Sequence, residues 1–264
     1  MTDKSFIFLA GHHRSGTSLL HEIIKEHPLI SGFSNTGVPE DEGMFLQNVY
    51  EPAKTYGGPG KYIFDKNSHM DENHPLATVE NANSILQQWE KYYDKNCPYY
   101  VEKSPPNIVR TRFLQKLYPN SRFIFIFRHP LAVSYATRKW SKTRIKSLIE
   151  HTLRGYEILL NDISHLNNAY ILRYEDFVLS PQETINNVFN FLDLETVNVE
   201  HKIRPDVNEK YFSTWEEERK RLISRIRFPI SNKVEKRVNA LGYSLLHYRE
   251  LKDVSFLGVH NTLK

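Results

Sequence analysis

The sequence predicts an α/β protein with a central parallel β-sheet flanked by helices on both faces. Short apolar runs that suit buried strands alternate with segments of helical periodicity along most of the 264 residues. The first run, residues 6–9, leads through a loop between Gly11 and Gly16 into a helical pattern at residues 19–24. A strand, a glycine-bounded loop and a helix in succession are typical of phosphate-binding proteins, so the expected sheet is of the P-loop type.

The remaining elements follow the same alternation. Further strands are expected at residues 29–34, 99–101, 123–127 and 169–172. Helices are expected at residues 76–93, 108–118, 131–139, 148–166, 181–192, 216–226 and 233–241. The glycine- and proline-rich residues 50–65 are expected to form an irregular surface excursion that covers a cleft, and residues 204–215 to be polar and irregular. No repeat or shift in composition divides the chain, which predicts one domain over residues 1–264.

The loop between Gly11 and Gly16 matches the G-x-x-x-x-G-K-[ST] template except that Thr17 stands in the place of the lysine. Backbone N–H groups of the turn and the positive end of the helix dipole would converge on one point, which favours an anion there. The missing lysine argues against a nucleoside triphosphatase, and no apolar strand ends in an evident metal-binding aspartate. A monophosphate end or a sulfated phosphate fits better, and an ordinary turn with two glycines is the alternative.

Charge and cysteine content exclude several classes of protein. Lys and Arg number 35 against 31 Asp and Glu, a net charge of +4 that suits an anionic ligand but lacks the basic clustering of a nucleic-acid binder. Cys97 is the single cysteine, so a disulfide framework and a Cys-rich zinc site are excluded and a reducing compartment is permitted. There is no apolar run near the length of a membrane span. We therefore expect a soluble, cytoplasmic protein with no nucleic-acid partner and no membrane segment.

Three motifs carry a resemblance to a known family. They are GHHRSGTSLL at residues 11–20, RHPLAVS at residues 128–134 and LRYEDF at residues 172–177. In this order they resemble the sulfotransferases that use 3′-phosphoadenosine 5′-phosphosulfate (PAPS), over most of the chain. The chain looks closest to the carbohydrate and tyrosylprotein branch and its bacterial relatives. The resemblance implies transfer of a sulfuryl group from PAPS, without a metal, to the hydroxyl of a small-molecule or glycan acceptor, with carbohydrate as the leading acceptor class.

The resemblance also implies which residues hold PAPS. The first loop would bind the 5′-phosphosulfate through Arg14, Ser15, Gly16, Thr17 and Ser18, with Arg14 on the bridging oxygen or the sulfuryl group.

At the other anion site the resemblance places Arg128 on the 3′-phosphate, because its guanidinium follows a strand end. Ser134 stands two positions before the serine that the family uses there, where this chain has Ala136, and two positions turn a helical side chain by about 200°. Arg138 is kept as a substitute ligand. The resemblance places Tyr174 near the adenine. Residues 204–215 occupy the place of a loop that covers the cofactor in the family, and the resemblance suggests three weaker contacts there, namely Asn208, Lys210 and Tyr211.

Sulfuryl transfer needs a base for the proton of the acceptor. The branch that this chain resembles uses a glutamate in a loop after the first helix, and Glu42 is the preferred match, followed by Asp41 and Glu40, ahead of an apparent helix at residues 44–46. Solvated surface charge is the alternative for all three carboxylates. Rival bases are histidines near the expected site: His12, His13 and His129.

Lys103 resembles the basic residue that the tyrosylprotein branch places at a comparable strand end to stabilise the sulfuryl group, and a solvent-facing turn lysine is its alternative. Two other classes of function stay open from the sequence. The first is a P-loop kinase of a small molecule, which would bind ATP with Mg²⁺. The second is a non-catalytic nucleotide-binding protein that retains the phosphate site.

Overall fold

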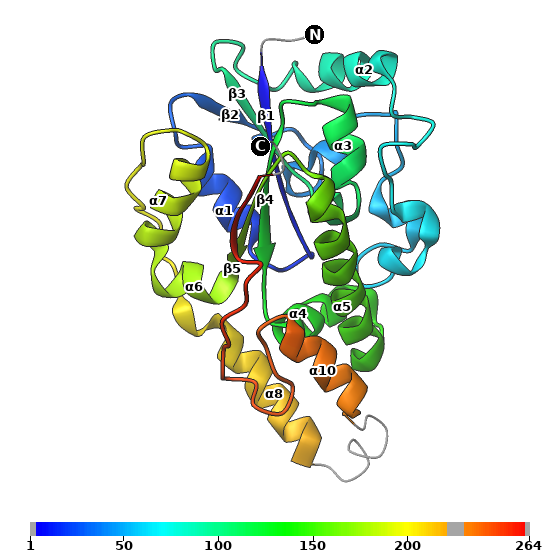
Figure 1. Ribbon diagram of the computed structural model, residues 1–264, viewed down its shortest axis with the longest axis vertical. Helices are drawn as coiled ribbons and strands as arrows, with labels where there is room; N and C mark the ends of the chain where they lie inside the picture. Colours follow the sequence, from blue (N-terminus) through cyan, green and yellow to red (C-terminus); the bar gives the residue numbers. More distant parts are fainter. Residues whose placement is uncertain (1–3, 221–229, 262–264) are drawn as a thin grey trace.

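A mixed β-sheet forms the centre of the molecule. The computed structural model describes residues 4–220 and 230–261, and within them a six-stranded sheet has the order β2-β3-β1-β4-β5-β6 (Figure 1). The strands are β1 Ser5–Gly11, β2 Ile30–Gly32, β3 Tyr99–Lys103, β4 Arg122–Phe127, β5 Asn168–Arg173 and β6 Gly258–Asn261. The first five are parallel, as predicted, and β6 pairs antiparallel with β5 at the edge. No pattern in the sequence predicted this last strand.

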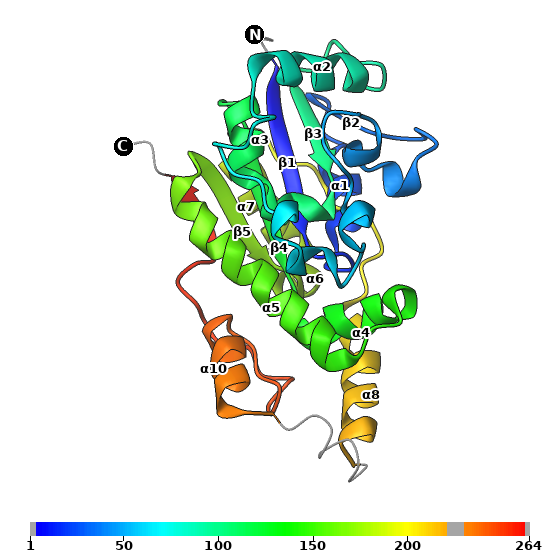
Figure 2. The same cartoon turned by 90° about the vertical axis from the view of Figure 1, so that its right-hand side faces the viewer.

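Helices cover both faces of the sheet, as predicted (Figures 1 and 2). They are α1 Thr17–Ile24, α2 Val79–Trp89, α3 Thr111–Leu117, α4 Pro130–Ser141, α5 Ile145–Asp162, α6 Tyr174–Leu179, α7 Pro181–Phe191, α8 Glu209–Lys220 and α10 Asn232–Ala240. Helices α1, α6 and α7 lie on one face, and α2, α3, α4 and α5 on the other. Proline at the first position starts both α4 and α7, where its missing N–H leaves no intrahelical bond unmade.

Two hydrophobic cores follow from the alternation of side chains along the strands. In β1, Phe6 and Phe8 face the core that contains α2, α3 and α5, whereas Ile7 and Leu9 face the core that contains α1, α6 and α7. All four side chains are at most 1% exposed. Burying a side chain of this size stabilises the fold by about 1.5–3 kcal/mol. The central strand is thereby fixed from both faces, and with it the position of the loop that follows Gly11.

The prediction of an irregular surface excursion at residues 50–65 is confirmed only in part, because residues 51, 54, 55, 57, 61 and 64 are exposed but other residues of the segment are buried. The segment forms short 3₁₀ helices at Ala53–Tyr56 and Tyr62–Phe64, and it packs on α5. Tyr62 and Ile63 are 0% and 2% exposed and belong to the larger core. The glycines mark turns with positive φ rather than a detached loop.

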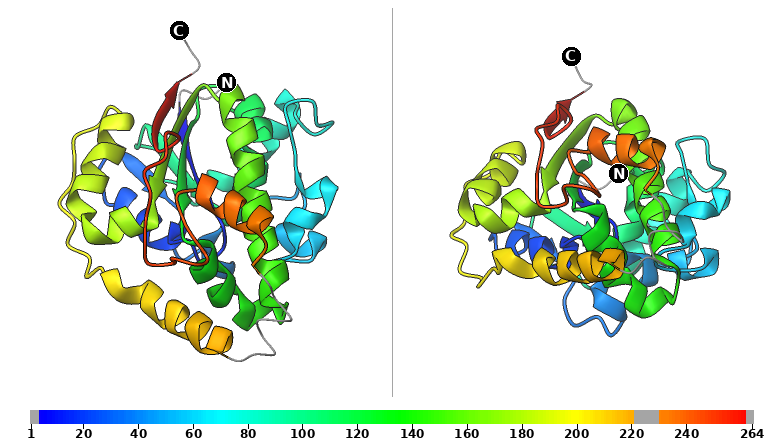
Figure 3. Two further views of the ribbon diagram at one scale, coloured as in Figure 1. Left: turned by 60° about the horizontal axis from the view of Figure 1, so that its bottom comes forward. Right: turned by 90° about the horizontal axis from the view of Figure 1, so that it is seen from below.

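The chain after residue 204 is also more ordered than expected. Residues 204–215 include a 3₁₀ helix, Pro205–Asn208, and the start of α8 at Glu209, so the expectation of an irregular segment is wrong. The helix expected at residues 216–226 is the second half of α8 as far as Lys220; the rest lies outside the described residues. After α10 the chain runs back beside the sheet to β6, as Figures 1 and 3 show. Across residues 4–220 and 230–261, no helix combines the length and the hydropathy needed to cross a membrane.

Candidate active site

The predicted site residues gather at the carboxyl ends of β3, β1 and β4. Lys103 lies opposite Leu9 in the register of β3 and β1, and Ile126 lies opposite Gly11 in that of β4 and β1, so the three strand ends are neighbours. The chain leaves β1 toward β2 on one side and crosses from β3 to β4 on the other. Ligands of open α/β sheets bind at such a switch of direction.

The loop after β1 is shaped for an anion. Ser15 N–H donates to the His12 carbonyl at 3.0 Å, which closes a tight turn, and Gly16 at φ 108° leads into α1. Within the described residues no side chain caps the N-terminus of α1, so its first N–H groups face the loop. A Cβ at Gly16 would lie 2.6 Å from the Tyr174 ring. Glycine is therefore required for two reasons, the positive φ and the closeness of this ring. Exposed N–H groups and the helix dipole together fit a phosphate.

Arg14 lies in this loop with φ 69° and is exposed. Its guanidinium carbon lies 4.9 Å from the centre of the Trp140 ring at the end of α4, a cation–π contact. Trp140 is 54% exposed, so the pair forms an exposed aromatic and cationic surface beside the loop.

Arg128, at the end of β4, ties this loop to the C-terminal part of the chain. Its Nη1 donates to the Arg14 carbonyl at 2.7 Å, and its Nε and Nη2 donate to Asn208 Oδ1 at 2.9 and 2.7 Å. Its guanidinium carbon lies 4.0 Å from the centre of the Tyr174 ring. These bonds use three of the five N–H groups of a guanidinium. Counting only residues 4–220 and 230–261, two N–H groups stay available for an anion.

A buried carboxylate, Glu175, supports this arrangement from behind. It accepts hydrogen bonds from His129 N at 3.0 Å, from Asn208 Nδ2 at 2.7 Å and from the Tyr243 hydroxyl at 3.0 Å. His129 Nδ1 in turn accepts from Leu131 N at 3.1 Å, which caps α4. Burial lowers the pKa of His129 to about 3. The geometry gives His129 a structural task, and the polar Asn208 proves central although the sequence offered it only as a weak contact.

Glu42 and Lys103 come together beside the loop. Lys103 Nζ lies 3.6 Å from Glu42 Oε1 and donates to the Glu40 carbonyl at 2.7 Å. The Lys103 and Glu42 residues are 1% and 5% exposed. Burial raises the pKa of Glu42 to about 7; the Lys103 charge opposes that rise, and the charges of Glu102 and Glu40 add to it. A carboxylate with a pKa near neutrality is suited to general base catalysis.

The other two carboxylates of this segment have different environments. Asp41 accepts hydrogen bonds from Asn35 N at 3.1 Å and from Thr36 N at 2.8 Å, as well as from the Thr36 hydroxyl. Burial would raise the pKa of Asp41, but these bonds outweigh burial and lower it. Glu40 is exposed, and its Oε2 accepts from the Ser18 hydroxyl at 3.3 Å. Instead of the helix expected at residues 44–46, only a 3₁₀ turn, Gly43–Phe45, follows Glu42.

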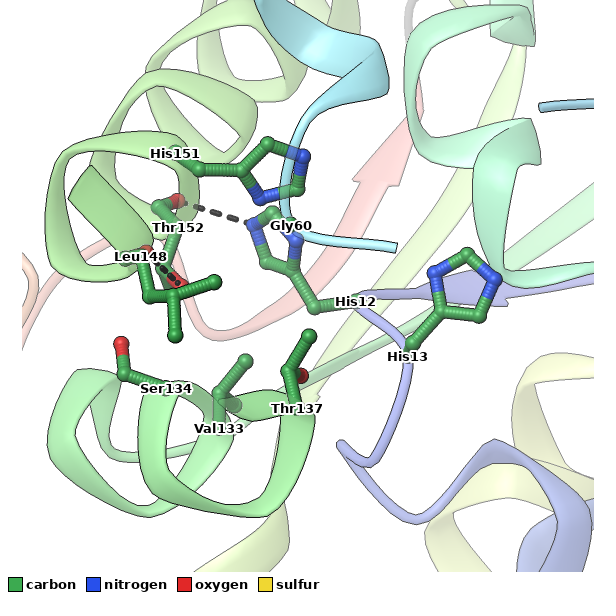
Figure 4. Close-up of a pocket in the computed structure, with 9 residues that line it drawn as sticks. All are labelled: His12, His13, Gly60, Val133, Ser134, Thr137, Leu148, His151 and Thr152. Atoms are coloured by element: carbon green, nitrogen blue, oxygen red, sulfur yellow. Dashed lines mark hydrogen bonds between the residues drawn. The ribbon is translucent and has the colours of Figure 1, made fainter. Parts of the chain in front are cut away.

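Histidines and hydroxyls line a small cavity between α4 and α5 (Figure 4). His12 Nε2 donates to the Thr152 carbonyl at 2.8 Å, and burial lowers the pKa of His12 to about 4. Burial, with the charges of His12 and Lys103, lowers the pKa of His13 to about 3. Both rings therefore stay neutral near pH 7. Among the described residues, neither ring forms a hydrogen bond with Glu42.

Among the described residues, Ser134 and Arg138 share no hydrogen bond with Arg128. Ser134 is fully buried and faces the cavity between α4 and α5, and among the described residues its hydroxyl has no hydrogen-bond partner. Arg138 is exposed, and its Nη1 lies 2.8 Å from Glu218 of α8. Ser15, by contrast, belongs to the phosphate loop, where its buried hydroxyl lies over Gly11 and likewise lacks a partner in the described part of the chain. The structure thus brings Arg14, Arg128 and Tyr174 into contact, whereas the roles predicted for Ser134 and Arg138 stay predictions.

The fold and site define a class: an open α/β sheet with a phosphate loop after the first strand and a second basic site at the neighbouring strand end. This chain belongs to the sulfotransferase family, whose model matches residues 6–198. A putative protein-tyrosine sulfotransferase of Caenorhabditis briggsae is 24% identical over 200 residues, 73% of this chain and 66% of the relative. Protein-tyrosine sulfotransferase 2 of Gallus gallus is 20% identical over 203 residues, 73% of this chain and 52% of the relative.

The fold agrees with solved sulfotransferase structures. The sulfotransferase domain from the curacin biosynthetic pathway superposes with a TM-score of 0.54 at 16% identity, over 91% of this chain and 98% of that domain. The likeness confirms the predicted architecture. The curated relatives are longer than this chain: it spans about two thirds of the nematode protein and about half of the chicken protein.

Proposed function

We propose that the protein transfers a sulfuryl group from PAPS to the hydroxyl of an acceptor. The observation that carries the proposal is the buried Glu42–Lys103 pair, 3.6 Å apart, which lies next to the phosphate loop. The loop and the pair are connected, because Ser18 at the start of α1 bonds Glu40, whose carbonyl accepts from Lys103. This reaction requires a base whose pKa is near 7, a cation and a loop that binds an anion.

The proposed step balances as follows. PAPS, when bound, supplies the sulfuryl group and a phosphate leaving group. Glu42 takes the proton of the acceptor hydroxyl while the acceptor oxygen forms its bond to sulfur, and the bond from sulfur to the 5′-phosphate oxygen breaks with its electron pair on the phosphate. Lys103 lies where an ammonium group can stabilise the sulfuryl oxygens. The N–H groups of the loop and Arg14 stabilise the charge that develops on the phosphate, and adenosine 3′,5′-bisphosphate is released.

A second anion position is proposed at Arg128. Two of its N–H groups stay available, and its stacking on Tyr174 and its bonds to Asn208 fix the direction of the guanidinium. A fixed, bidentate donor is the arrangement that recognises a phosphate group. We assign the 3′-phosphate to Arg128 and the adenine to the neighbourhood of Tyr174, and we keep Ser134 and Arg138 as further candidate contacts.

For the acceptor we propose a carbohydrate. Of the three tryptophans, Trp89 and Trp215 are buried in the core and only Trp140 is exposed, beside Arg14, where its face can stack on a sugar ring. A tyrosine side chain is the second candidate, favoured by the names of the relatives in Caenorhabditis briggsae and Gallus gallus.

Two measurements test the proposal. Adenosine 3′,5′-bisphosphate should raise the unfolding temperature, and ATP with Mg²⁺ should not; selective stabilisation by ATP would instead favour a small-molecule kinase. A screen with labelled PAPS against sugars, phenols, lipids and tyrosine-containing peptides then identifies the acceptor. Stabilisation by the bisphosphate with no transfer to any acceptor class would favour a non-catalytic nucleotide-binding protein.

A further inference from the structure

The backbone that carries Glu42 is fixed through the two residues that follow it. Gly43 N–H donates to Glu102 Oε1 at 3.0 Å, and the Gly43 carbonyl accepts from the Trp89 indole at 2.9 Å. Met44 N–H donates to the Ser104 hydroxyl at 3.1 Å. Both hydrogen-bonding groups of Gly43 are thus held by side chains from β3 and α2, so the Glu42 backbone cannot shift without breaking buried bonds.

Position 43 requires glycine because the Glu102 side chain lies close to the backbone there. A Cβ at position 43 would lie 2.6 Å from Glu102 Cγ and Oε1 and 2.8 Å from the Phe33 ring. Glu102 is fully buried, and it also accepts hydrogen bonds from the Ser104 hydroxyl at 2.5 Å and from the Asn107 side-chain amide. Three donors converge on a carboxylate that neither the proposed mechanism nor the sequence motifs assign.

We propose that Glu102 is a positioning residue, which holds Gly43 and thereby places Glu42 against Lys103. The order of residues in β3 explains how this works. Glu102 and Lys103 are neighbours in one strand, so their side chains leave it on opposite faces. One binds the backbone after Glu42, and the other contacts the Glu42 carboxylate. The same rigid strand end therefore sets both the place of the base and the place of its cationic partner.

Glu102 also acts on Glu42 through its charge. The groups that face Glu42 are Lys103 and Glu102 of β3, Glu40 of the preceding turn and the Tyr62 hydroxyl. The Lys103 charge lowers the pKa of Glu42, and the charges of Glu102 and Glu40 raise it. Burial raises the pKa of Glu102 itself, while the bonds from Ser104, Asn107 and Gly43 oppose this rise by favouring the charged form.

The variant Glu102→Gln tests the charge of Glu102 separately from its role in holding Gly43 in position. The glutamine carbonyl can keep the bonds from Gly43 and Ser104. The new amide would face the Asn107 amide, but Asn107 Oδ1 is buried without a partner in the described part of the chain, so a flip of the Asn107 side chain restores the pair. The backbone of Glu42 should then stay in place while one negative charge is lost. We expect the titration of Glu42 to move to lower pH.

Carbon-13 NMR of labelled glutamate carboxylates measures this titration without any turnover, and the signal of Glu42 is assigned by its loss in Glu42→Gln. Asp162→Asn is the matched control, because Asp162 is a buried carboxylate on α5 that is paired with Arg112 and His69 and is absent from the groups acting on Glu42. An unchanged Glu42 midpoint in Glu102→Gln, or an equal shift in Asp162→Asn, would overturn the electrostatic part of the inference.

Trp89→Phe tests the positioning, because it removes the indole bond to the Gly43 carbonyl; it also removes part of the ring packing against Phe6 and Phe33, so urea unfolding of the variant must show that the fold is retained. The inference rests on the proposed function here, and we expect kcat to fall by about tenfold to a hundredfold with KM for PAPS unchanged, since small displacements of a catalytic group have such effects. A rise in KM with kcat unchanged would overturn it. A Glu42 signal that responds to Glu102→Gln in a protein with no transfer activity would uphold the inference and defeat the proposed function.

Discussion

The raised pKa of Glu42 makes a quantitative prediction about stability. The pKa lies at about 7 in the folded chain against 4.5 for an unperturbed glutamate, so the folded state binds the additional proton between these values. Stability from this group is fully present below pH 4.5 and is lost as the pH rises through 7. Each pKa unit corresponds to about 1.4 kcal/mol, so the ionised, buried Glu42 should reduce the free energy of unfolding by about 3 kcal/mol at pH 8.

The assay compares wild type with Glu42→Gln in urea unfolding from pH 5 to pH 8. The difference in free energy of unfolding should grow in favour of the variant up to pH 7 and then level off, because glutamine does not titrate. Asp41→Asn is the control: the pKa of Asp41 is lowered, so its contribution is already constant in this range. A difference curve for Glu42→Gln that is flat from pH 5 to pH 8 would refute the reasoning and would remove the main argument for Glu42 as the base.

Three more predictions concern the nucleotide and acceptor sites. Gly16→Ala should reduce the free energy of unfolding by more than about 1 kcal/mol, because φ 108° is strained for alanine and its Cβ would meet Tyr174; urea unfolding at wild-type level would contradict this. Arg128→Lys should weaken binding of adenosine 3′,5′-bisphosphate at least about tenfold in calorimetry, since lysine cannot bond Asn208 twice; an unchanged affinity would exclude Arg128 from the site. Trp140→Ala should change the free energy of unfolding by less than about 0.5 kcal/mol and raise KM for a sugar acceptor. An unchanged KM would show that Trp140 does not contact the acceptor.

The sequence predicted the regular elements where burial dominates. The parallel strands β1, β4 and β5 were found because each contains a run of apolar residues, which central strands require, and β3 was found from the three residues Tyr99–Val101 that precede its charged end. The start of α8 was missed because the helix is mostly charged and only its residues 211, 212 and 215 are buried. Strand β6 was missed because its four residues show no alternation of apolar and polar side chains, and because its partner strand β5 lies far away in the sequence.

The sequence named candidate residues for the site, but it could not predict the distances between them. The family resemblance suggested Glu42 and Lys103 separately, while their separation of 3.6 Å depends on a 3₁₀ turn and on the bonds of Gly43. Ser134 lines the cavity between α4 and α5 together with His12 and His13, and its contact with a phosphate stays a prediction. No local pattern pointed to Glu102, because its importance comes from donors that approach it from three other positions.

The C-terminal return of the chain has a consequence for the boundaries of the folding unit. The family model ends at residue 198, yet Asn208 and Tyr243 supply two of the donors to Glu175, and the Ser244 carbonyl lies 3.2 Å from His129 Nε2. A fragment cut at residue 198 would keep every sulfotransferase motif, but Glu175 would lose two of its three donors and the Arg128 guanidinium would lose Asn208. The segment that identifies the family is therefore shorter than the segment that must fold together. The residues beyond it hold Arg128 and Glu175 in place after the carboxyl ends of β4 and β5.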